Sequence, residues 1–434
     1  MDHAAAPADY RALAQDHLSP VVGRYFERSW SHGLGHRLFD TGGKSYLDFA
    51  NGIAVSALGH GHPAVSRAIH EQVDRLIVPT GAIGYAEPVA RLAIELAGTF
   101  PAPLDTVMFL NSGSETIEAA LKLARRTTGR AGIVAFRGGF HGRTFGAASV
   151  TSSALNYRTG YEPLLPGVHL LPFPAVYRDF DGDEARATEY CLAALDELVR
   201  SVIPAEAIAS ILVEPVQGEG GYNPAPAAFL QGLRTFSERH GILLIADEVQ
   251  TGYGRTGTMW AFEQAGIVPD VVCVAKAIAN GLPLSAIISS HALQEAWGRS
   301  AHGSTFGGNP VACAAGLAVL ATIASEDLVA NAAARGAELS RGLATIAAED
   351  SRIGDVRGPG LMIGIEFVKN GSVAQPDAAL VERLVAECAD AGLLILSCGR
   401  DHNVVRLIPP LDLSPAEVGE ALGIIDRTLA SIPA

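Results

Sequence analysis

The chain has 434 residues, of which 48% are hydrophobic and 18% charged, and its formal net charge is −14. A chain of this length has room for roughly two or three domains with a sizeable core. The negative charge argues against a nucleic-acid partner and an anionic membrane surface, although local arginines could still bind an anionic substrate.

The lack of targeting signals and the spacing of the cysteines exclude further classes of protein. No stretch approaches the roughly 20 continuous apolar residues of a membrane span, and the N-terminal residues lack the pattern of a secretion signal. The five cysteines are widely spaced and match neither a disulfide framework nor a zinc site. We therefore expect a cytoplasmic protein with reduced thiols, no membrane segment and no bound metal.

The predicted elements fall into three segments. Residues 1–60 contain strand-like pieces around Gly43 and are expected to pack with a small C-terminal domain. Residues 61–325 are expected to form a large domain, in which apolar strand-like runs alternate with amphipathic helical runs. The predicted strands are 106–110, 132–136, 168–171, 210–214, 241–247, 271–275 and 285–289. This alternation predicts an α/β fold with a mostly parallel seven-stranded sheet covered by helices on both faces.

Residues 326–434 show a different pattern, with more helix and shorter strands. The predicted elements are a helix at 328–348, a strand at 363–367, a helix at 377–391, strands at 393–396 and 404–407, and a last helix from 415 to about 429. This order predicts a smaller α+β domain.

The first motif, Asn-Ser-Gly-Ser-Glu at residues 111–115, lies where a predicted strand gives way to a helix. Ser112 and Glu115 form a capping-box pattern, so this helix would present free backbone N–H groups at its start. Gly113 would let a phosphate approach these groups closely. A capped helix with nothing bound is the commoner explanation of such a motif by itself.

Two glycine-rich loops follow later strands. Residues 136–143 place glycines around Phe140 and His141, which would let an aromatic ring lie flat against a planar cofactor. Arg143 in this loop could clamp a carboxylate. Residues 214–221 contain Glu219, whose functional role would require a positive partner inside a pocket. Each loop alone also fits an ordinary turn.

A carboxylate and an amine end two apolar runs. Asp247 closes the run 241–247, and Lys276 follows the run 271–275. Ligands of open α/β sheets bind at the carboxyl ends of strands, and this pair is what a pyridoxal phosphate enzyme needs: a lysine for the Schiff base and an aspartate for the pyridine nitrogen. Taken singly, Lys276 also fits a solvated strand end, and Asp247 with the following Glu248 also fits a metal site.

Two further segments carry weaker signals. Residues 303–310 form a glycine-rich loop before a helix, with hydroxyls that could reach a phosphate or simply cap the helix. The two histidines at residues 59–63 lie beside a proline with no clear third ligand, and we interpret them as structural.

Taken together, the motifs at 111–115, 140–143, 214–220, 247–252, 275–278 and 305–310 resemble those of the class III aminotransferases, which are pyridoxal phosphate enzymes of fold type I. The resemblance extends from about residue 37 to the last helix, with the motifs in the family's order. Within the family the chain is most similar to the 4-aminobutyrate enzymes, chiefly through residues 218–221 and 396–406.

The resemblance implies the following cofactor-binding roles. Lys276 would bond the cofactor and then carry the proton, and Asp247 would pair with the ring nitrogen. The other cofactor-binding residues would be Gly113, Ser114, Phe140, His141, Val249, Gln250 and Thr305, with Thr305 supplied by the neighbouring subunit. A site shared in this way implies a homodimer, and whether dimers pair into tetramers is left open.

The substrate logic follows from charge. Arg143 would bind the distal carboxylate of an ω-amino acid or of glutamate, and Arg406 would bind the α-carboxylate of glutamate or 2-oxoglutarate. Because an ω-amino acid has no α-carboxylate, Glu219 would pair with Arg406 in that half-reaction and swing aside in the other. Ile53 matches an apolar residue over the substrate.

One departure concerns residues 79–85, which carry small side chains where the 4-aminobutyrate enzymes have polar and aromatic ones. We therefore expect a roomier entrance that tolerates longer ω-amino acids or amines.

The expected reaction is transfer of an amino group from an ω-amino acid to 2-oxoglutarate, giving a semialdehyde and glutamate. Acetylornithine, ornithine and diaminobutyrate remain alternative donors, and racemisation or decarboxylation on the same fold are alternative reactions. A non-catalytic regulator is disfavoured because both Lys276 and Asp247 are present.

Overall fold

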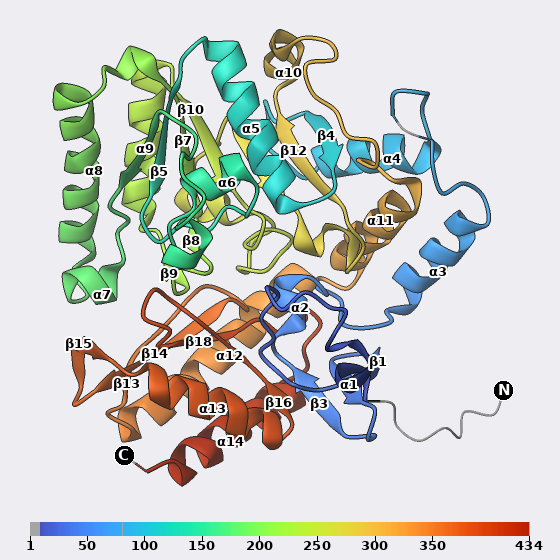
Figure 1. The fold of residues 1–434 in the computed structure, drawn as a ribbon, viewed down its shortest axis with the longest axis vertical. Coiled ribbons are helices and arrows are strands. Elements are labelled where there is room, and N and C mark those ends of the chain that lie inside the picture. Colours follow the sequence, from blue (N-terminus) through green and yellow to red (C-terminus); the bar gives the residue numbers. More distant parts are fainter. Residues whose placement is uncertain (1–8, 80, 434) are drawn as a thin grey trace.

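The computed structural model describes residues 9–79 and 81–433. Within these residues, a seven-stranded, a five-stranded and a four-stranded sheet contain most of the strands. The C-terminal elements lie below the seven-stranded sheet in Figure 1, with the N-terminal strands beside them, so segments from both ends of the chain lie together.

The largest sheet has the strand order β4-β12-β11-β10-β7-β5-β6. Only β12 among these strands runs antiparallel to its neighbours, and the other pairs are parallel. The predicted mostly parallel seven-stranded sheet is therefore confirmed. Its strands are β4 (Thr106–Leu110), β5 (Gly132–Phe136), β6 (Val168–Leu171), β7 (Ile208–Val213), β10 (Leu243–Asp247), β11 (Val271–Val274) and β12 (Ser285–Ser289).

Helices cover both faces of this sheet. Successive residues of β11 point to opposite faces: Val271 and Cys273 belong to the apolar cluster that includes the helix α5, and Val272 and Val274 belong to the larger cluster on the other side. Burial on both faces explains why these strands are continuous apolar runs. The main covering helices are α5 (Gly113–Thr128), α8 (Glu184–Ser201), α9 (Ala227–His240) and α11 (Pro310–Ser325).

Shorter elements connect these layers. The short α-helices and the pair of helices before β4 are α1 (Tyr10–Ala14), α2 (Asn51–Ala54), α3 (Pro63–Val73), α4 (Glu87–Ala97), α6 (Phe145–Val150), α7 (Val176–Phe180) and α10 (His291–Trp297). The 3-10 helices are η1 (Leu155–Tyr157), η2 (Ala205–Ala207), η3 (Ala261–Ala265) and η4 (Lys276–Ala279). A two-stranded ribbon consists of β8 (Val216–Gln217) and β9 (Asn223–Pro224).

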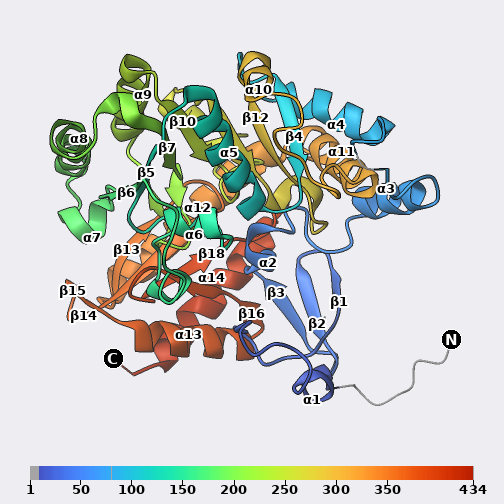
Figure 2. The same cartoon turned by 45° about the horizontal axis from the view of Figure 1, so that its top comes forward.

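The remaining strands form two sheets below the large one (Figure 2). The antiparallel five-stranded sheet contains β13 (Ile353–Arg357), β14 (Ile363–Lys369), β15 (Ser372–Pro376), β17 (Leu396–Cys398) and β18 (Val404–Leu407), and the helices here are α12 (Leu328–Glu349), α13 (Ala378–Asp390) and α14 (Pro415–Ser431). The four-stranded sheet joins β1 (Trp30–Leu34), β2 (Arg37–Asp40) and β3 (Ser45–Asp48) to β16 (Leu393–Leu394), which runs parallel to β3.

Apart from small shifts in strand bounds, two differences from the predicted elements concern the smaller sheets. The predicted strand 393–396 is two strands, because Leu393–Leu394 pairs with β3 whereas Leu396–Cys398 pairs with β18. The strands β13 and β15 were not predicted, since both mix polar and small residues and are mostly half-exposed or exposed. Only their pairing with β14 makes them strands.

Among the described residues, no single helix is long and apolar enough to cross a membrane; α11 and α12 pass that test only as a pair bent by 66°.

A histidine links the N-terminal strands to the last helix. His36 lies 2.9 Å from Asp412 through Nε2 and 2.9 Å from Glu417 through Nδ1. Only a doubly protonated imidazole donates from both nitrogens. Although burial lowers the pKa of His36, the two carboxylates raise it from 6.5 to about 9. Although burial raises the pKa of Glu417, hydrogen bonds from His36 and Ser414 lower it from 4.5 to about 2.

These shifts predict a pH dependence of stability. The His36 contribution is complete below pH 6.5 and is lost as the pH rises through about 9, and the Glu417 contribution is complete above pH 4.5 and is lost as the pH falls through about 2. We expect the free energy of unfolding to fall by roughly 1 to 3 kcal/mol between pH 6.5 and 9.5. Urea unfolding of His36→Gln should lose this slope, whereas the exposed His17→Gln control should keep it. An unchanged slope in His36→Gln would contradict this account.

Candidate active site

A cavity of about 330 Å³ lies at one edge of the large sheet. Its walls come from the segments that directly follow β4, β5, β7, β10 and β11, all of which run in the same direction. The carboxyl ends of parallel strands meet at one edge, which is where open α/β sheets bind ligands. Loops far apart in the sequence therefore converge here.

Asp247 and Lys276 both line this cavity, at the ends of the neighbouring strands β10 and β11. Asp247 is 4% exposed, and its Oδ1 accepts a hydrogen bond from the Val249 backbone N–H at 3.1 Å. Burial lowers the pKa of Lys276, which favours the neutral, nucleophilic amine. Lys276 also has φ = 50°, a left-handed conformation that is strained for a lysine.

His141 orients the Asp247 carboxylate. Its Nδ1 lies 2.7 Å from Asp247 Oδ2, and its backbone N–H donates to Thr151 Oγ1 at 2.9 Å. Although burial lowers the pKa of His141, the hydrogen bond to Asp247 outweighs this effect and raises it. A histidine that donates to the carboxylate holds it in one orientation, with its charge available to a ligand in the cavity.

The start of α5 forms a narrow cradle. Ser112 caps the helix by accepting a hydrogen bond from the Glu115 N–H at 3.3 Å, and the first N–H groups of a helix have no partner inside it. A Cβ added at Gly113 would lie 3.0 Å from Val249 Cγ1. Gly142, with φ = 130°, lies against Ser114, where a Cβ would be 2.2 Å from the hydroxyl oxygen. Only glycines leave this helix start open enough for an anion to approach.

Glu214 joins two of the glycine-rich loops. Its Oε1 accepts the Phe140 N–H at 2.8 Å, and its Oε2 accepts the Gly218 N–H at 2.9 Å. Burial, together with the charge of Asp247, raises the pKa of Glu214 to about 7. One buried carboxylate thus fixes the loop that carries the Phe140 ring relative to the loop that carries Glu219.

Arg406, which is completely buried on β18, makes an ion pair with Glu219 through Nη1. Its Nη2 donates to the Tyr25 hydroxyl at 3.1 Å. Burial lowers the pKa of Arg406, but the negative charge of Glu219 outweighs this effect and raises it, so the guanidinium stays charged. Glu219 lines the cavity, which places an arginine behind a carboxylate that a competing ligand carboxylate could displace.

Four of the predicted residues do not line the cavity, and one of them is Arg406, which lies behind Glu219. Ile53 is half-buried with φ = 66°, close in sequence to the cavity residue Val55. Arg143 is exposed, and its guanidinium carbon lies 5.9 Å from the centroid of Phe140 and 5.1 Å from that of Tyr157. Thr305 is exposed in the loop before α11.

The predicted entrance segment lies on the surface near that loop. Asn309 at the start of α11 donates a hydrogen bond from Nδ2 to the carbonyl of Ile77, two residues before this segment, at 3.0 Å. Ile83 is 81% exposed and Tyr85 is fully exposed, whereas Thr80 lies outside the described residues.

Two site residues were missed by sequence reasoning. Glu214 stands in a recognised motif, but its bridge to Phe140 depends on a second loop that the motif does not contain. Tyr25 lies in an irregular segment without any motif, and nothing in the sequence signals its contact with Arg406.

Known proteins resemble this chain over most of its length. The family model for class III aminotransferases matches residues 22–429. The chain is 39% identical over 417 residues to the 5-aminovalerate aminotransferase DavT of Pseudomonas aeruginosa, covering 96% of this chain and 94% of that protein. It is 39% identical over 393 residues to the 4-aminobutyrate aminotransferase GabT of Escherichia coli K12, covering 90% and 91%.

Solved structures also resemble this chain over nearly its whole length. A PLP-bound amine transaminase from an uncultivated Pseudomonas species has a TM-score of 0.88 at 34% identity, covering 99% of this chain and 97% of that chain. A phospholyase from Arthrobacter in complex with phosphoethanolamine has a TM-score of 0.90 at 33% identity, covering 98% and 100%. The shared fold alone therefore does not decide between substrates.

Proposed function

The chain belongs to the class III aminotransferases, and on that premise we propose that it transfers the amino group of an ω-amino acid, such as 4-aminobutyrate or 5-aminovalerate, to 2-oxoglutarate. The buried ion pair between Glu219 and Arg406 carries this proposal. An ω-amino acid has no carboxylate beside its amine, so Arg406 needs the Glu219 partner while that donor reacts. 2-Oxoglutarate and glutamate carry such a carboxylate, which replaces Glu219.

The residues of the cavity fit pyridoxal phosphate, the cofactor of this family. Gln250 has a buried Oε1 without a hydrogen-bond partner in the described part of the chain, which suits a ring hydroxyl. The cradle at Gly113 and Ser114 suits the phosphate, and buried Asp247 suits a protonated ring nitrogen. When bound, the cofactor bonds the substrate nitrogen and withdraws electrons from the neighbouring carbon.

Each protein group then has a defined task. The Lys276 amine takes the proton from the substrate carbon and returns it to the cofactor side. Asp247, held by His141, would pair with the ring nitrogen, and Phe140 and Val249 would enclose the ring. Arg143 binds the distal carboxylate, with Ile53 packed over the substrate chain. The roles of Lys276, Asp247 and the two ring-enclosing residues rest on the family's motifs together with the convergence of the loops in one cavity, and those of Arg143 and Ile53 rest on the motifs alone.

We also propose a dimer in which Thr305 and the segment 79–85 of one copy complete the site of the other. The support is that Thr305, Ile83 and Tyr85 are exposed on one chain. The Asn309–Ile77 hydrogen bond links the end of the loop that carries Thr305 to the chain just before residue 79.

A half-reaction tests the function directly. The cofactor-loaded enzyme is mixed with 4-aminobutyrate or 5-aminovalerate without any keto acid. The visible absorbance of the bound cofactor should disappear, and 2-oxoglutarate should restore it. Glu219→Gln removes the charge that balances Arg406, so the rate of this half-reaction should fall by roughly 100-fold. The glutamate half-reaction should change by less than roughly threefold, because there Glu219 has already moved aside.

The exposed Glu326→Gln is the matched control and should alter neither rate. Conversion by glutamate or an ornithine derivative, but by no ω-amino acid, would overturn the donor and keep the aminotransferase. Equal losses in both half-reactions of Glu219→Gln would contradict the proposed exchange of carboxylates on Arg406.

A further inference from the structure

A second cavity, of about 780 Å³, lies behind the loops that form the first one. The two cavities share no lining residue in the described part of the chain, and Gly138 and Gly220 face the second cavity whereas Phe140 and Glu219 face the first. Its volume is within the range of small-molecule sites. This cavity has no part in the proposed amino-group transfer.

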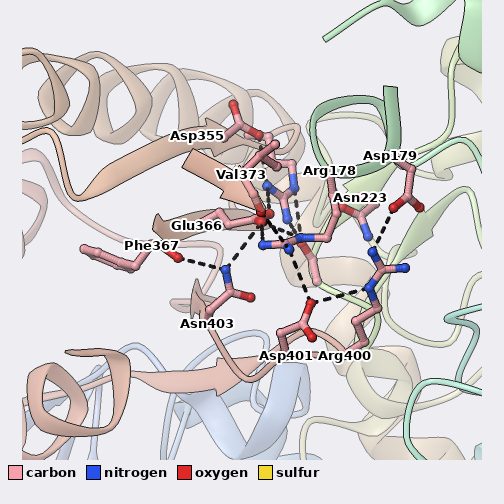
Figure 3. Close-up of polar contacts among 12 residues, drawn as sticks. Arg178, Asp179, Asn223, Asp355, Glu366, Phe367, Val373, Arg400, Asp401 and Asn403 are labelled. Carbon is pink, nitrogen blue, oxygen red and sulfur yellow. Dashed lines mark hydrogen bonds and ion pairs between the residues drawn. The ribbon is translucent and has the colours of Figure 1, made fainter. Parts of the chain in front are cut away.

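One wall of the second cavity is a network of paired charges (Figure 3). Arg178 of α7 donates from Nε to the buried Glu366 of β14 at 2.6 Å, and Arg400 donates from Nη2 to Asp179 at 2.8 Å. Arg357 donates to Asp355 at 2.9 Å. Each guanidinium on this wall has a carboxylate partner, so the wall is rigid and its charges are compensated.

Two further arginines that line this cavity, Arg137 and Arg158, have no carboxylate partner among the described residues. Arg158 Nη1 donates to the carbonyl oxygens of Ala148, Ser149 and Thr151 at 3.1, 2.9 and 2.5 Å, which fixes the guanidinium but leaves its charge uncompensated. The exposed Arg137 side chain makes no recorded polar contact in the described structure. In a chain with a net charge of −14, two such arginines form a local site of positive potential.

A buried hydroxyl lines the same cavity as these arginines. Ser153 lines the cavity and is 4% exposed, yet its Oγ has no hydrogen-bond partner in the part of the chain that the structure describes. The neighbouring Ser152 is occupied, since its Oγ accepts the Gly138 N–H at 3.1 Å. A buried polar group is normally paired, because an unpaired one is costly. Ser153 is therefore a donor that an acceptor inside the cavity would satisfy.

We propose that this second cavity binds a small organic anion. Its carboxylate or phosphate oxygens accept hydrogen bonds from Arg137, Arg158 and Ser153, and its apolar part packs against Phe173 and Phe180, which are buried in the cavity wall. A head group with several acceptor oxygens satisfies both cations and the hydroxyl at once. The site is independent of which amino donor the enzyme uses.

Calorimetric titration of the cofactor-loaded enzyme tests the proposal, with phenyl phosphate and benzoate as the probes for the two head groups. At least one probe should bind saturably. Arg137→Gln should weaken that binding by roughly tenfold and Ser153→Ala by roughly threefold, because each loses one hydrogen bond to an anion. Arg239→Gln, which removes the same charge from an exposed position on α9, should leave the affinity unchanged.

Ser153→Ala removes a hydroxyl without a partner, so this variant should keep the fold and the cofactor absorbance. Absence of saturable binding by both probes would overturn the proposal. Binding that is equally tight in Arg137→Gln and Ser153→Ala would overturn it too, since the probe would then occupy another site, including the first cavity.

Discussion

Replacing Lys276 with alanine should abolish amino-group transfer, with the rate of either half-reaction falling by roughly four orders of magnitude. Lys276 lines the cavity at the end of β11, one strand away from Asp247. No other lysine is among the residues that line the cavity in the described structure, so no second amine there can take over the proton. Single-turnover absorbance with 4-aminobutyrate measures the loss.

The exposed Lys369→Ala serves as the matched control and should keep the wild-type rate. Small primary amines added to Lys276→Ala should restore part of the activity, because they supply the missing base without the side chain. Borohydride reduction followed by mass spectrometry should find the cofactor attached to the Lys276 peptide of the wild type and to no peptide of the variant. Wild-type rates in Lys276→Ala would remove the residue from the mechanism.

Replacing Asp247 with asparagine should lower the rate of both half-reactions by roughly three orders of magnitude. The carboxylate is buried and receives hydrogen bonds from His141 and from the Val249 backbone, so it is preorganised. Asparagine retains the shape but cannot supply the negative charge that keeps a ring nitrogen protonated. Because Asp247 raises the pKa of His141, that pKa should also fall in the variant, as measured by NMR titration of the ring.

Two further variants are needed in this experiment, a surface control and a variant that keeps the charge but changes the shape. The exposed Asp74→Asn should leave rates and cofactor affinity unchanged. Asp247→Glu, which keeps the charge in a longer side chain, should recover more activity than Asp247→Asn. If Asp247→Asn lowered only the affinity for cofactor and not the rate at saturating cofactor, the proposed electronic role of Asp247 would be wrong.

The predictable part of the fold follows from burial on two faces of the large sheet. The bounds of β4, β5, β6 and β12 coincide with those predicted, because each is a short apolar run that ends at a clear change of composition. The same reasoning places Asp247 and Lys276 at strand ends. Their convergence follows from the parallel direction of β10 and β11.

What the sequence could not reveal depends on contacts between distant segments. The Glu214 carboxylate needs N–H groups from two loops, and the Tyr25 contact needs an irregular segment to reach β18. The position of Arg143 is a further case, because its exposed side chain lies against Phe140 and Tyr157, and the motif does not specify that contact. The charged wall of the second cavity joins α7 to the C-terminal sheet and lacks any local pattern.

The pairing of β3 with β16 has a consequence for synthesis on the ribosome. Leu47 at the beginning of the chain is aligned with Leu393 near its end, so the N-terminal sheet cannot be completed until almost the whole polypeptide has emerged. Until then the side chains of Tyr46, Leu47 and Phe49, which are fully buried in the finished protein, lack part of their cover. Nascent or prematurely terminated chains should therefore depend on chaperones that shield this N-terminal segment, and should be degraded quickly when such protection fails.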